Sequence, residues 1–149
     1  MKGYLDDSEA APRAFQGGWC HSGDVVAWHP DGYIEIRDRS KDVIISGGEP
    51  ISSIAVEQTV DQHPAVLEVA VVAIPDDKWG ERPKAFVAPR PGQTATEQEI
   101  IRFCKSRIAR FKAPAAVEIL DQLPKTSTGK VQKFLLRERE WAAHDKRVG

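Results

Sequence analysis

The 149-residue sequence has few cysteines, almost balanced charge and no long apolar run. Its two cysteines, Cys20 and Cys104, lie far apart without paired spacing, so no disulfide framework is expected. We expect both to be small, buried hydrophobic residues of a cytoplasmic protein. The 21 basic and 22 acidic residues give a formal net charge of -1, which gives no reason to expect nucleic acid as a partner. Without a run of about 18 apolar residues, no transmembrane segment is predicted.

Spacing excludes two further kinds of site. The four histidines lack the spacing of zinc ligands, so no metal site is predicted. The pair Gly129-Lys130 lies in "LPKTSTGKVQK", residues 123–133, but a Walker loop needs glycine where Pro124 stands and serine or threonine where Val131 stands. Lys130 is therefore either a solvated charge in a hydroxyl-capped turn before a helix or part of a different phosphate site.

Residue patterning predicts the class of fold. With 41% hydrophobic residues the chain can bury one core of moderate size. The order after residue 40 is β-α-β-β-α-β-α, so we expect a small α+β domain with a β-hairpin and a three-stranded sheet flanked by helices. The predicted hairpin spans 24–38, the strands span 42–46, 66–75, 84–90 and 115–121, and the helices span 51–63, 96–112 and the stretch after 130. A charged loop, 76–83, is expected between the two middle strands.

Helical periodicity predicts which residues of each helix face the core. Ser52 or Ser53 is expected to cap the first helix, and Thr96 with Glu99 forms a capping-box pattern at the second. The residues expected on buried faces are Ile51, Ile54, Ala55 and Thr59; then Ile100, Ile101, Cys104, Ile108 and Phe111; then Val131, Phe134, Leu135 and Trp141.

Two further stretches carry polar residues in unusual density. "WCHSGD", residues 19–24, ends in a Gly-Asp turn before a strand, and "RDRSKDVIISGGE", residues 37–49, surrounds a short apolar run with charges. Taken singly, Asp24 would cap a turn and Arg39 would be a surface charge of the hairpin. The two glycines at the end of the second stretch would form a bend.

Taken together, these three stretches resemble the C-terminal part of the adenylate-forming superfamily, which contains the acyl-CoA synthetases. "GGWCHSGD" is similar to the family's Trp-x-x-Thr-Gly-Asp stretch, and "LPKTSTGKVQK" to its Pro-x-Thr-x-x-Gly-Lys stretch. "IEIRDRSKDVIISGGEPISS" is similar to the stretch that ends in Gly-Gly-Glu-Asn-Ile. The resemblance covers about residues 1–140, and the residues of these stretches are most similar to those of the fatty-acyl-CoA ligases.

The resemblance implies a two-step ligase reaction. ATP activates a carboxylic acid, here a fatty acid, as an acyl-adenylate, and the thiol of coenzyme A then displaces AMP. Mg²⁺ would enter with ATP. Two alternatives stay open: a relative that passes the acyl group to the phosphopantetheine of a carrier protein, and a stand-alone interaction or regulatory module.

The resemblance also implies roles for four residues around the nucleotide. Asp24 would accept hydrogen bonds from the ribose hydroxyls of ATP or AMP, and Arg39 would lie beside it. Lys41 matches the hinge about which the family's C-terminal domain swings. Lys130 would bridge the substrate carboxylate and the α-phosphate as the adenylate forms.

A second group of residues would serve the thiol substrate. Gly47 and Gly48 would line the channel for the pantetheine arm of coenzyme A, because glycine lets backbone and ligand approach closely. Ser46 and Glu49 would flank this channel. Trp79 would stack on the coenzyme's adenine, or would only anchor its own loop.

Three positions depart from the family's pattern. Ser22 stands where threonine is usual and keeps the hydroxyl. Pro50 replaces asparagine, which removes a donor and stiffens the channel loop. Ala55 replaces glutamate, which breaks a capping box with Ser52.

The resemblance further implies how the chain is divided. Residues 1–37 would be the trailing segment of an N-terminal adenylation domain that the chain lacks, and residues 38–149 would be the mobile C-terminal lid domain. Met1 then corresponds to an interior methionine, and the missing domain is the expected partner.

On this interpretation the isolated chain is inactive, because Lys130 alone has no bound ATP and carboxylate on which to act. We predict that the purified chain catalyses no ATP–pyrophosphate exchange with fatty acids. Exchange that is measurable and abolished by Lys130→Ala would contradict this prediction.

Overall fold

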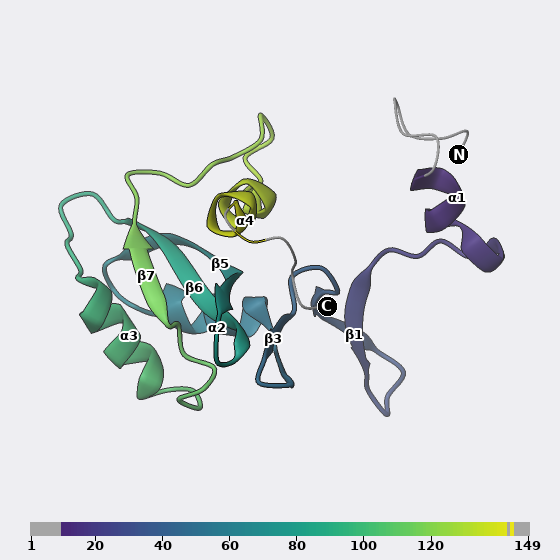
Figure 1. Ribbon diagram of the computed structural model, residues 1–149, viewed down its shortest axis with the longest axis horizontal. Helices are drawn as coiled ribbons and strands as arrows, with labels where there is room; N and C mark the ends of the chain where they lie inside the picture. Colours follow the sequence, from purple (N-terminus) through teal and green to yellow (C-terminus); the bar gives the residue numbers. More distant parts are fainter. Residues whose placement is uncertain (1–9, 143, 145–149) are drawn as a thin grey trace. The chain divides into compact units, whose positions relative to one another are not determined.

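The computed structural model describes residues 10–142 and residue 144. Contacts between residues divide the chain into two compact units, 1–41 and 42–149, which we call the N-terminal unit and the C-terminal unit. The boundary falls between Lys41 and Asp42. Each unit is described by itself (Figure 1).

The N-terminal unit contains the predicted hairpin. Strands β1 (Asp24–Trp28) and β2 (Ile34–Arg39) pair antiparallel, which confirms the prediction for 24–38. Two short helical segments, α1 (Ala10–Ala14) and η1 (Gln16–Gly18), precede them. Gly32 has a φ of 88° in the connecting turn, a conformation that glycine adopts without strain.

The C-terminal unit is built on one long hairpin. Strands β5 (Val66–Asp76) and β6 (Gly80–Pro89) pair antiparallel down to Asp76 opposite Gly80. The loop predicted over 76–83 is therefore too long, since most of that stretch belongs to the strands. The polar composition of this stretch favoured a loop, but the stretch forms strand because Glu81 is fully buried and accepts a hydrogen bond from the Ile45 amide at 2.9 Å.

The sheet has five strands, whereas the sequence predicted three. β7 (Ala116–Ile119) runs parallel to β6, and the short hairpin of β3 (Ile44–Ser46) and β4 (Glu49–Ile51) joins β6 through the pair Ser46–Gly80. The short β4 was missed because glycines and Pro50 mask its pattern. The predicted α+β class is confirmed, with a mixed sheet.

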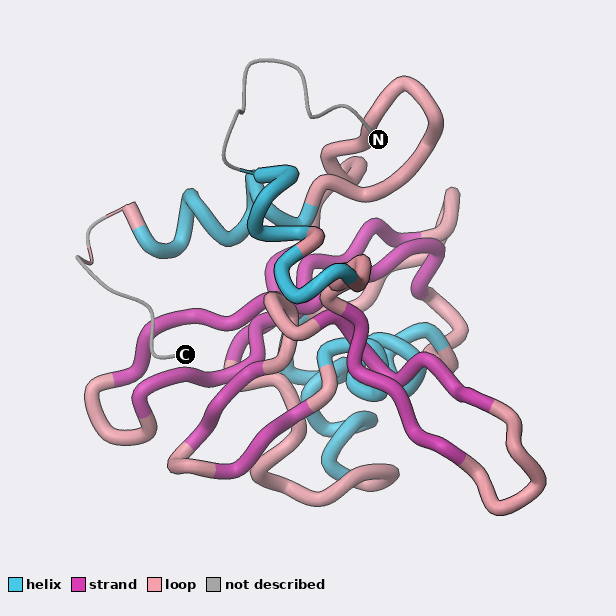
Figure 2. The backbone as a smooth tube through the Cα atoms, turned by 90° about the vertical axis from the view of Figure 1, so that its right-hand side faces the viewer, coloured by secondary structure: helices cyan, strands magenta, loops and turns pink. Residues whose placement is uncertain are grey.

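Both faces of the β5–β6 hairpin are buried, and alternate residues supply the two cores. Val71, Ala73 and Val87 belong to one core, and Val72 and Phe86 to the other. This explains the nearly continuous apolar run of β5, since a strand covered on both faces needs no polar alternation. Figure 1 draws α3 and α4 on opposite sides of these strands, and Figure 2 gives the side view.

Helix α2 (Ser53–Asp61) packs in the first core. Its N-cap is Ser52, whose hydroxyl accepts a hydrogen bond from the Ala55 amide at 3.2 Å, so one half of the capping box survives. The predicted buried face is partly wrong, because Ala55 is exposed and Ile51 lies in β4. The helix begins at Ser53 and therefore turns Val56 and Val60, with Thr59, into the core.

Helix α3 (Glu97–Lys105) shows the predicted capping box. The Glu99 carboxylate accepts from the Thr96 amide at 2.7 Å, and this bond lowers the pKa of Glu99. Ile100 and Cys104 are buried as predicted. The helix ends well before residue 112, because amides after Lys105 turn back to the Cys104 carbonyl, and Phe111 is consequently 53% exposed.

Helix α4 (Lys133–Trp141) covers the second face through Leu136. The sequence predicted Phe134 and Leu135 on the buried face, but these are 49% and 41% exposed. The indole of Trp141 donates to the Ala73 carbonyl at 2.8 Å, so the end of the helix is fixed to β5. That bond, together with the burial of Leu136, sets which side of the helix faces the sheet.

The two cysteines differ in environment. Cys104 is buried, and desolvation raises the pKa of its thiol to about 11. Cys20 is exposed, so the prediction that it is buried is wrong. Within the described residues, no helix has the length and apolar character needed to cross a membrane.

The first core depends on Ile100, which is fully buried between α3 and the sheet. We predict that Ile100→Ala lowers the free energy of unfolding by about 3 kcal/mol, because it leaves a cavity. Ile119→Ala, at a position 40% exposed in β7, should cost less than about 1 kcal/mol. Urea denaturation of both variants checks this, and equal losses would contradict it.

Candidate functional site

Lys130 lies at the end of a small loop that is closed by hydrogen bonds. Lys125 and Val131 form an isolated antiparallel bridge, and the Thr126 amide donates to the Lys130 carbonyl at 2.8 Å. The Thr126 hydroxyl in turn accepts from the Lys130 amide at 3.1 Å, and Gly129 supplies the turn with a φ of 83°. The backbone that carries Lys130 is therefore held in place from both sides.

The hydroxyl groups of this loop close the loop rather than cap the helix. The N-cap of α4 is Gln132, whose side chain makes no capping hydrogen bond. The prediction that a hydroxyl group caps this helix is therefore wrong. The Thr126 hydroxyl instead accepts a hydrogen bond within its own turn. Lys130 is exposed and forms no ion pair with any residue that the structure describes.

Asp24 and Arg39 face each other at the open end of the β1–β2 hairpin. They are paired in the register, and Arg39 Nε lies 3.7 Å from Asp24 Oδ1. The Asp24 side chain is 26% exposed and that of Arg39 is 73% exposed, so both can reach a ligand. The hydroxyl of Ser22, which stands where threonine is usual, accepts from the Asp24 amide at 3.3 Å. Lys41 is the last residue of this unit.

The turn between β3 and β4 is built from Gly47 and Gly48, whose φ values are 59° and 87°. The Gly47 amide donates to the Trp79 carbonyl at 2.8 Å. A Cβ at Gly47 would lie only 2.8 Å from Trp79 Cε3, whereas one at Gly48 would meet open space. The Trp79 ring therefore rests on Gly47 and anchors its loop, and 46% of the residue stays exposed.

A pocket of about 370 Å³ opens beside this turn. It brings together four of the residues selected from the sequence: Ser46, Gly47, Glu49 and Trp79. Three further lining residues, Arg82, Arg110 and Phe111, were not selected. Arg110 and Phe111 were assigned to a helix that in fact ends earlier, so only the proline at 114 hinted that they lie in a loop.

Asp76 fixes the position of Trp79. Its Oδ1 accepts from the Trp79 amide at 2.9 Å and from the Lys78 amide at 3.0 Å. These bonds, with Arg82 at 3.7 Å, lower the pKa of the Asp76 carboxyl. Asp76 was not selected from the sequence. The Lys78 ammonium lies 4.7 Å from the Trp79 ring centroid, which adds positive charge beside the pocket.

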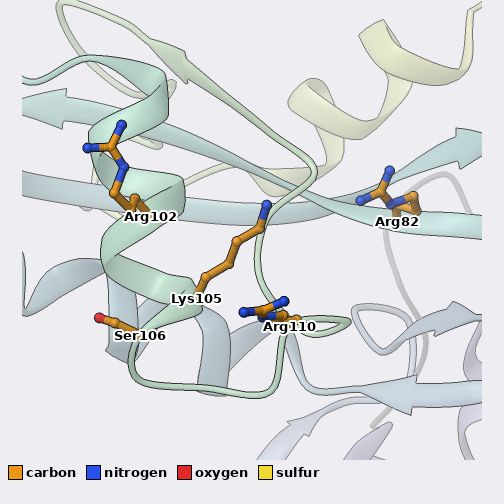
Figure 3. A pocket seen from close by; sticks show the side chains of 5 residues that line it. All are labelled: Arg82, Arg102, Lys105, Ser106 and Arg110. Carbon is orange, nitrogen blue, oxygen red and sulfur yellow. The ribbon is translucent and has the colours of Figure 1, made fainter.

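A second pocket, of about 550 Å³, shares two residues with the first. Arg82 and Arg110 line both, and the second pocket adds Arg102, Lys105 and Ser106 from α3 and the turn after it. Figure 3 shows the Lys105 side chain extending from α3 above Arg110, with Arg102 on one side and Arg82 farther away on the other. The two pockets thus share a basic wall.

Lys130 does not line either pocket. Figure 1 draws the loop between β7 and α4, which holds Lys130, and the turn between β3 and β4 at opposite ends of the C-terminal unit. The unit therefore carries two separate candidate sites, a single exposed lysine and a pocket with a basic extension.

Comparison with known families decides what kind of domain this is. The family described as the AMP-binding enzyme C-terminal domain matches residues 55–130, which is half of the chain. The chain belongs to this family. The resemblance inferred from the three sequence stretches is thereby confirmed.

Named relatives agree with this assignment. An acetate–CoA ligase from Humulus lupulus is 54% identical over 93% of this chain. ATP-bound MatB from Rhodopseudomonas palustris is 32% identical with a TM-score of 0.84 over 97% of this chain. The o-succinylbenzoate CoA synthetase of Bacillus subtilis, bound to its acyl-adenylate, is 35% identical with a TM-score of 0.80 over 100% of this chain. The chain spans 25% of the first relative and 29% of each structure.

The contact between Gly47 and Trp79 gives a direct test of the pocket geometry. We predict that Gly47→Ala costs about 2–4 kcal/mol of stability, because it combines left-handed backbone strain with a clash against the indole. Gly48→Ala carries the strain alone and should cost about 1 kcal/mol. Urea denaturation measures both costs, and the indole NMR signal of Trp79 should shift only in the first variant. A shift of equal size in both variants would contradict the contact.

Proposed function

We propose that the C-terminal unit is the mobile catalytic domain of an ATP-dependent acid–CoA ligase and works against a larger adenylation domain. The carboxylate attacks the α-phosphate of ATP to give acyl-adenylate and pyrophosphate. The thiol of coenzyme A then attacks the acyl carbon and releases AMP. The observation that carries the proposal is that one family member's domain presents Lys130 in the loop between β7 and α4, apart from the pocket lined by Gly47 and Trp79.

Lys130 serves the first step. Its ammonium stabilises negative charge that is shared between the carboxylate and the α-phosphate as the new bond forms. The ordered loop around Thr126 fixes its backbone, while the exposed side chain has no ion pair with a described residue to break before it reaches the substrate. A long stem with a compact charge suits a role in which the lysine withdraws afterwards.

Asp24 and Arg39 bind the nucleotide. The carboxylate accepts hydrogen bonds from ribose hydroxyls, and the guanidinium beside it donates to ribose or phosphate oxygens. Their opposite positions across the hairpin support a joint role, because one ligand can reach both side chains. Both residues keep their contacts with the ribose through both steps, because ATP and AMP have the same ribose.

The pocket at the glycine turn serves the second step. Gly47 and Gly48 admit the pantetheine arm, Ser46 and Glu49 flank it, and the exposed face of Trp79 offers a surface for adenine. Because Lys130 lies at the other end of the unit, the two steps need two orientations of the domain. Lys41, at the boundary between the units, is the hinge.

Magnesium is expected to accompany ATP. No group of three or more His, Cys, Asp or Glu side chains suited to a metal ion occurs in the described part of the chain. The ion would enter with ATP, whose phosphates are its usual ligands.

A chimera tests the proposal. The chain replaces the matching quarter of the Humulus lupulus acetate–CoA ligase, and acetate-dependent ATP–pyrophosphate exchange is measured. We predict that Lys130→Ala lowers the exchange rate roughly 100-fold to 1000-fold, the usual effect of removing one donor that stabilises a transition state. Thioester formation from acetyl-adenylate supplied ready-made should change less than about threefold, because Lys130 acts before that step.

Lys125→Ala is the matched control. Lys125 lies in the same loop but pairs with Glu68, so its loss should change exchange less than about threefold. If Lys130→Ala slows both half-reactions equally, Lys130 is a structural residue and the proposal is wrong. An inactive parent chimera would also count against it.

A further inference from the structure

Helix α4 begins three residues after Lys130, and its N-cap does not fix where it begins. Gln132 makes no side-chain capping hydrogen bond. Its amide donates to the Pro124 carbonyl at 2.8 Å, which joins the two ends of the Lys130 loop to each other. Lys125 pairs with Glu68 of β5, but these side chains are 37% and 31% exposed, and such pairs contribute little. The position of the loop therefore depends on what holds the start of the helix.

Lys133, the first residue of α4, directs its side chain into a shielded polar cluster. Its Nζ lies 2.7 Å from Glu57 Oε1 and donates to the Ser53 hydroxyl at 3.1 Å. The side chains of Lys133 and Glu57 are 20% and 18% exposed, and Ser53 is fully buried. The same Glu57 oxygen accepts from the Val71 amide at 2.7 Å. One ammonium group thus joins the start of α4 to both α2 and β5.

A shielded ion pair supplies geometry more than stability. Removing two charges from water costs about as much as their attraction returns, so an apolar pair of similar size would stabilise the domain as well. The ammonium and the carboxylate, however, must meet within hydrogen-bond distance. An apolar side chain at position 133 could pack against α2 at several depths. The polar cluster therefore restricts the position of α4 more closely than stability requires.

We propose that Lys133 and Glu57 are positioning residues for Lys130 in the formation of the acyl-adenylate. The pair holds the first turn of α4, and the bridge between Lys125 and Val131 ties the loop to that turn. Lys133 itself contacts no substrate. The inference rests on the proposed function and adds to it the pair of residues that determines where the Lys130 ammonium can reach.

The pair is placed to affect the first half-reaction and not the second. Among the described residues, none of those that line the pocket at the glycine turn belongs to α2 or α4. A catalytic group that is misplaced by about 1 Å can lose roughly 100-fold in rate. Loss of the pair should therefore slow adenylation and leave thioester formation nearly unchanged.

The chimera with the Humulus lupulus acetate–CoA ligase tests the inference. Lys133→Met removes the ammonium and keeps an unbranched side chain, so acetate-dependent ATP–pyrophosphate exchange should fall roughly 10-fold to 100-fold. Thioester formation from supplied acetyl-adenylate should change less than about threefold. Lys133→Arg keeps the charge and the donors and should hold exchange within about threefold of the parent.

A second readout uses the chain of residues 1–149 and needs no activity. In NMR spectra, Lys133→Met should shift the backbone amide signals of Thr126 and Lys130, which are bonded within the loop before α4. Lys133→Arg should leave these signals close to their original positions. If Lys133→Met does not fold, Glu57→Gln gives the same test, because it removes the charge while an oxygen still accepts from the Val71 amide.

Lys84→Met is the matched control. Lys84 Nζ lies 2.8 Å from Glu140 near the end of α4, and its side chain is 14% exposed, so its loss removes a shielded ion pair of the same helix. Urea denaturation should show a loss of stability at least as large as that of Lys133→Met. The ratio of the two half-reaction rates should stay within about threefold of the parent, because the Lys130 loop precedes the other end of α4.

The inference is overturned if Lys133→Met slows both half-reactions equally or leaves exchange unchanged. Exchange that falls as far in Lys84→Met would also overturn it, because general destabilisation would then be the cause. Unshifted Lys130 signals in Lys133→Met, or loss of exchange in Lys133→Arg, would count against it in the same way.

Lys130→Ala is measured beside these variants. If it fails to slow exchange selectively, the proposed function is wrong. If it slows exchange selectively while Lys133→Met has no effect, only the positioning role of Lys133 and Glu57 is wrong.

Discussion

The structure of the C-terminal unit depends on one constraint, the burial of both faces of the β5–β6 hairpin. Val71 and Val87 face one core, and Val72 and Phe86 face the other. Because neither face can be left to water, the chain must supply helices on both sides. Helices α2 and α3 cover the first face and α4 covers the second, so the connections to these helices emerge at different places around the sheet.

The two candidate sites lie in those connections. The loop that enters α4 presents Lys130, while the β3–β4 turn and the segment after α3 form the pockets. Under the proposed function this separation requires two poses of the unit, because one active centre can meet only one end of the unit at a time.

The sequence correctly predicted those structural features that depend only on residues close together in the chain. The capping box of Thr96 and Glu99, the β1–β2 hairpin and the glycine turn need only neighbours in sequence to be recognised. The sequence did not predict features that depend on contacts between residues far apart in the chain. The Trp79 ring on Gly47 explains that glycine, and the hydrogen bonds of Asp76 that orient Trp79 are closed only by the turn of the long hairpin.

Buried faces of helices were the weakest predictions, for a physical reason. In α2 the hydroxyl of Ser52 fixes where the helix starts, and a start one residue away would turn different side chains inward. In α4 the hydrogen bond of the Trp141 indole and the burial of Leu136 determine which side of the helix faces the sheet. The apolar character of Phe134 and Leu135 had predicted a different buried face. Arg110 was not predicted as a pocket residue for a similar reason. Helix α3 ends in a turn of backbone hydrogen bonds, and no single residue in the sequence marks that end.

Ion pairs of α4 connect this helix to the first residue of the C-terminal unit and to α2. Arg137 binds Asp42, the residue after Lys41, and Lys133 Nζ lies 2.7 Å from Glu57 of α2. Glu57 also accepts from the Val71 amide at 2.7 Å, so α4, α2 and β5 are joined through one carboxylate. All these side chains are largely shielded from water, where breaking one partner of a pair is costly. Because α4 directly follows the loop that holds Lys130, these contacts fix that loop to the same sheet that carries the β3–β4 turn.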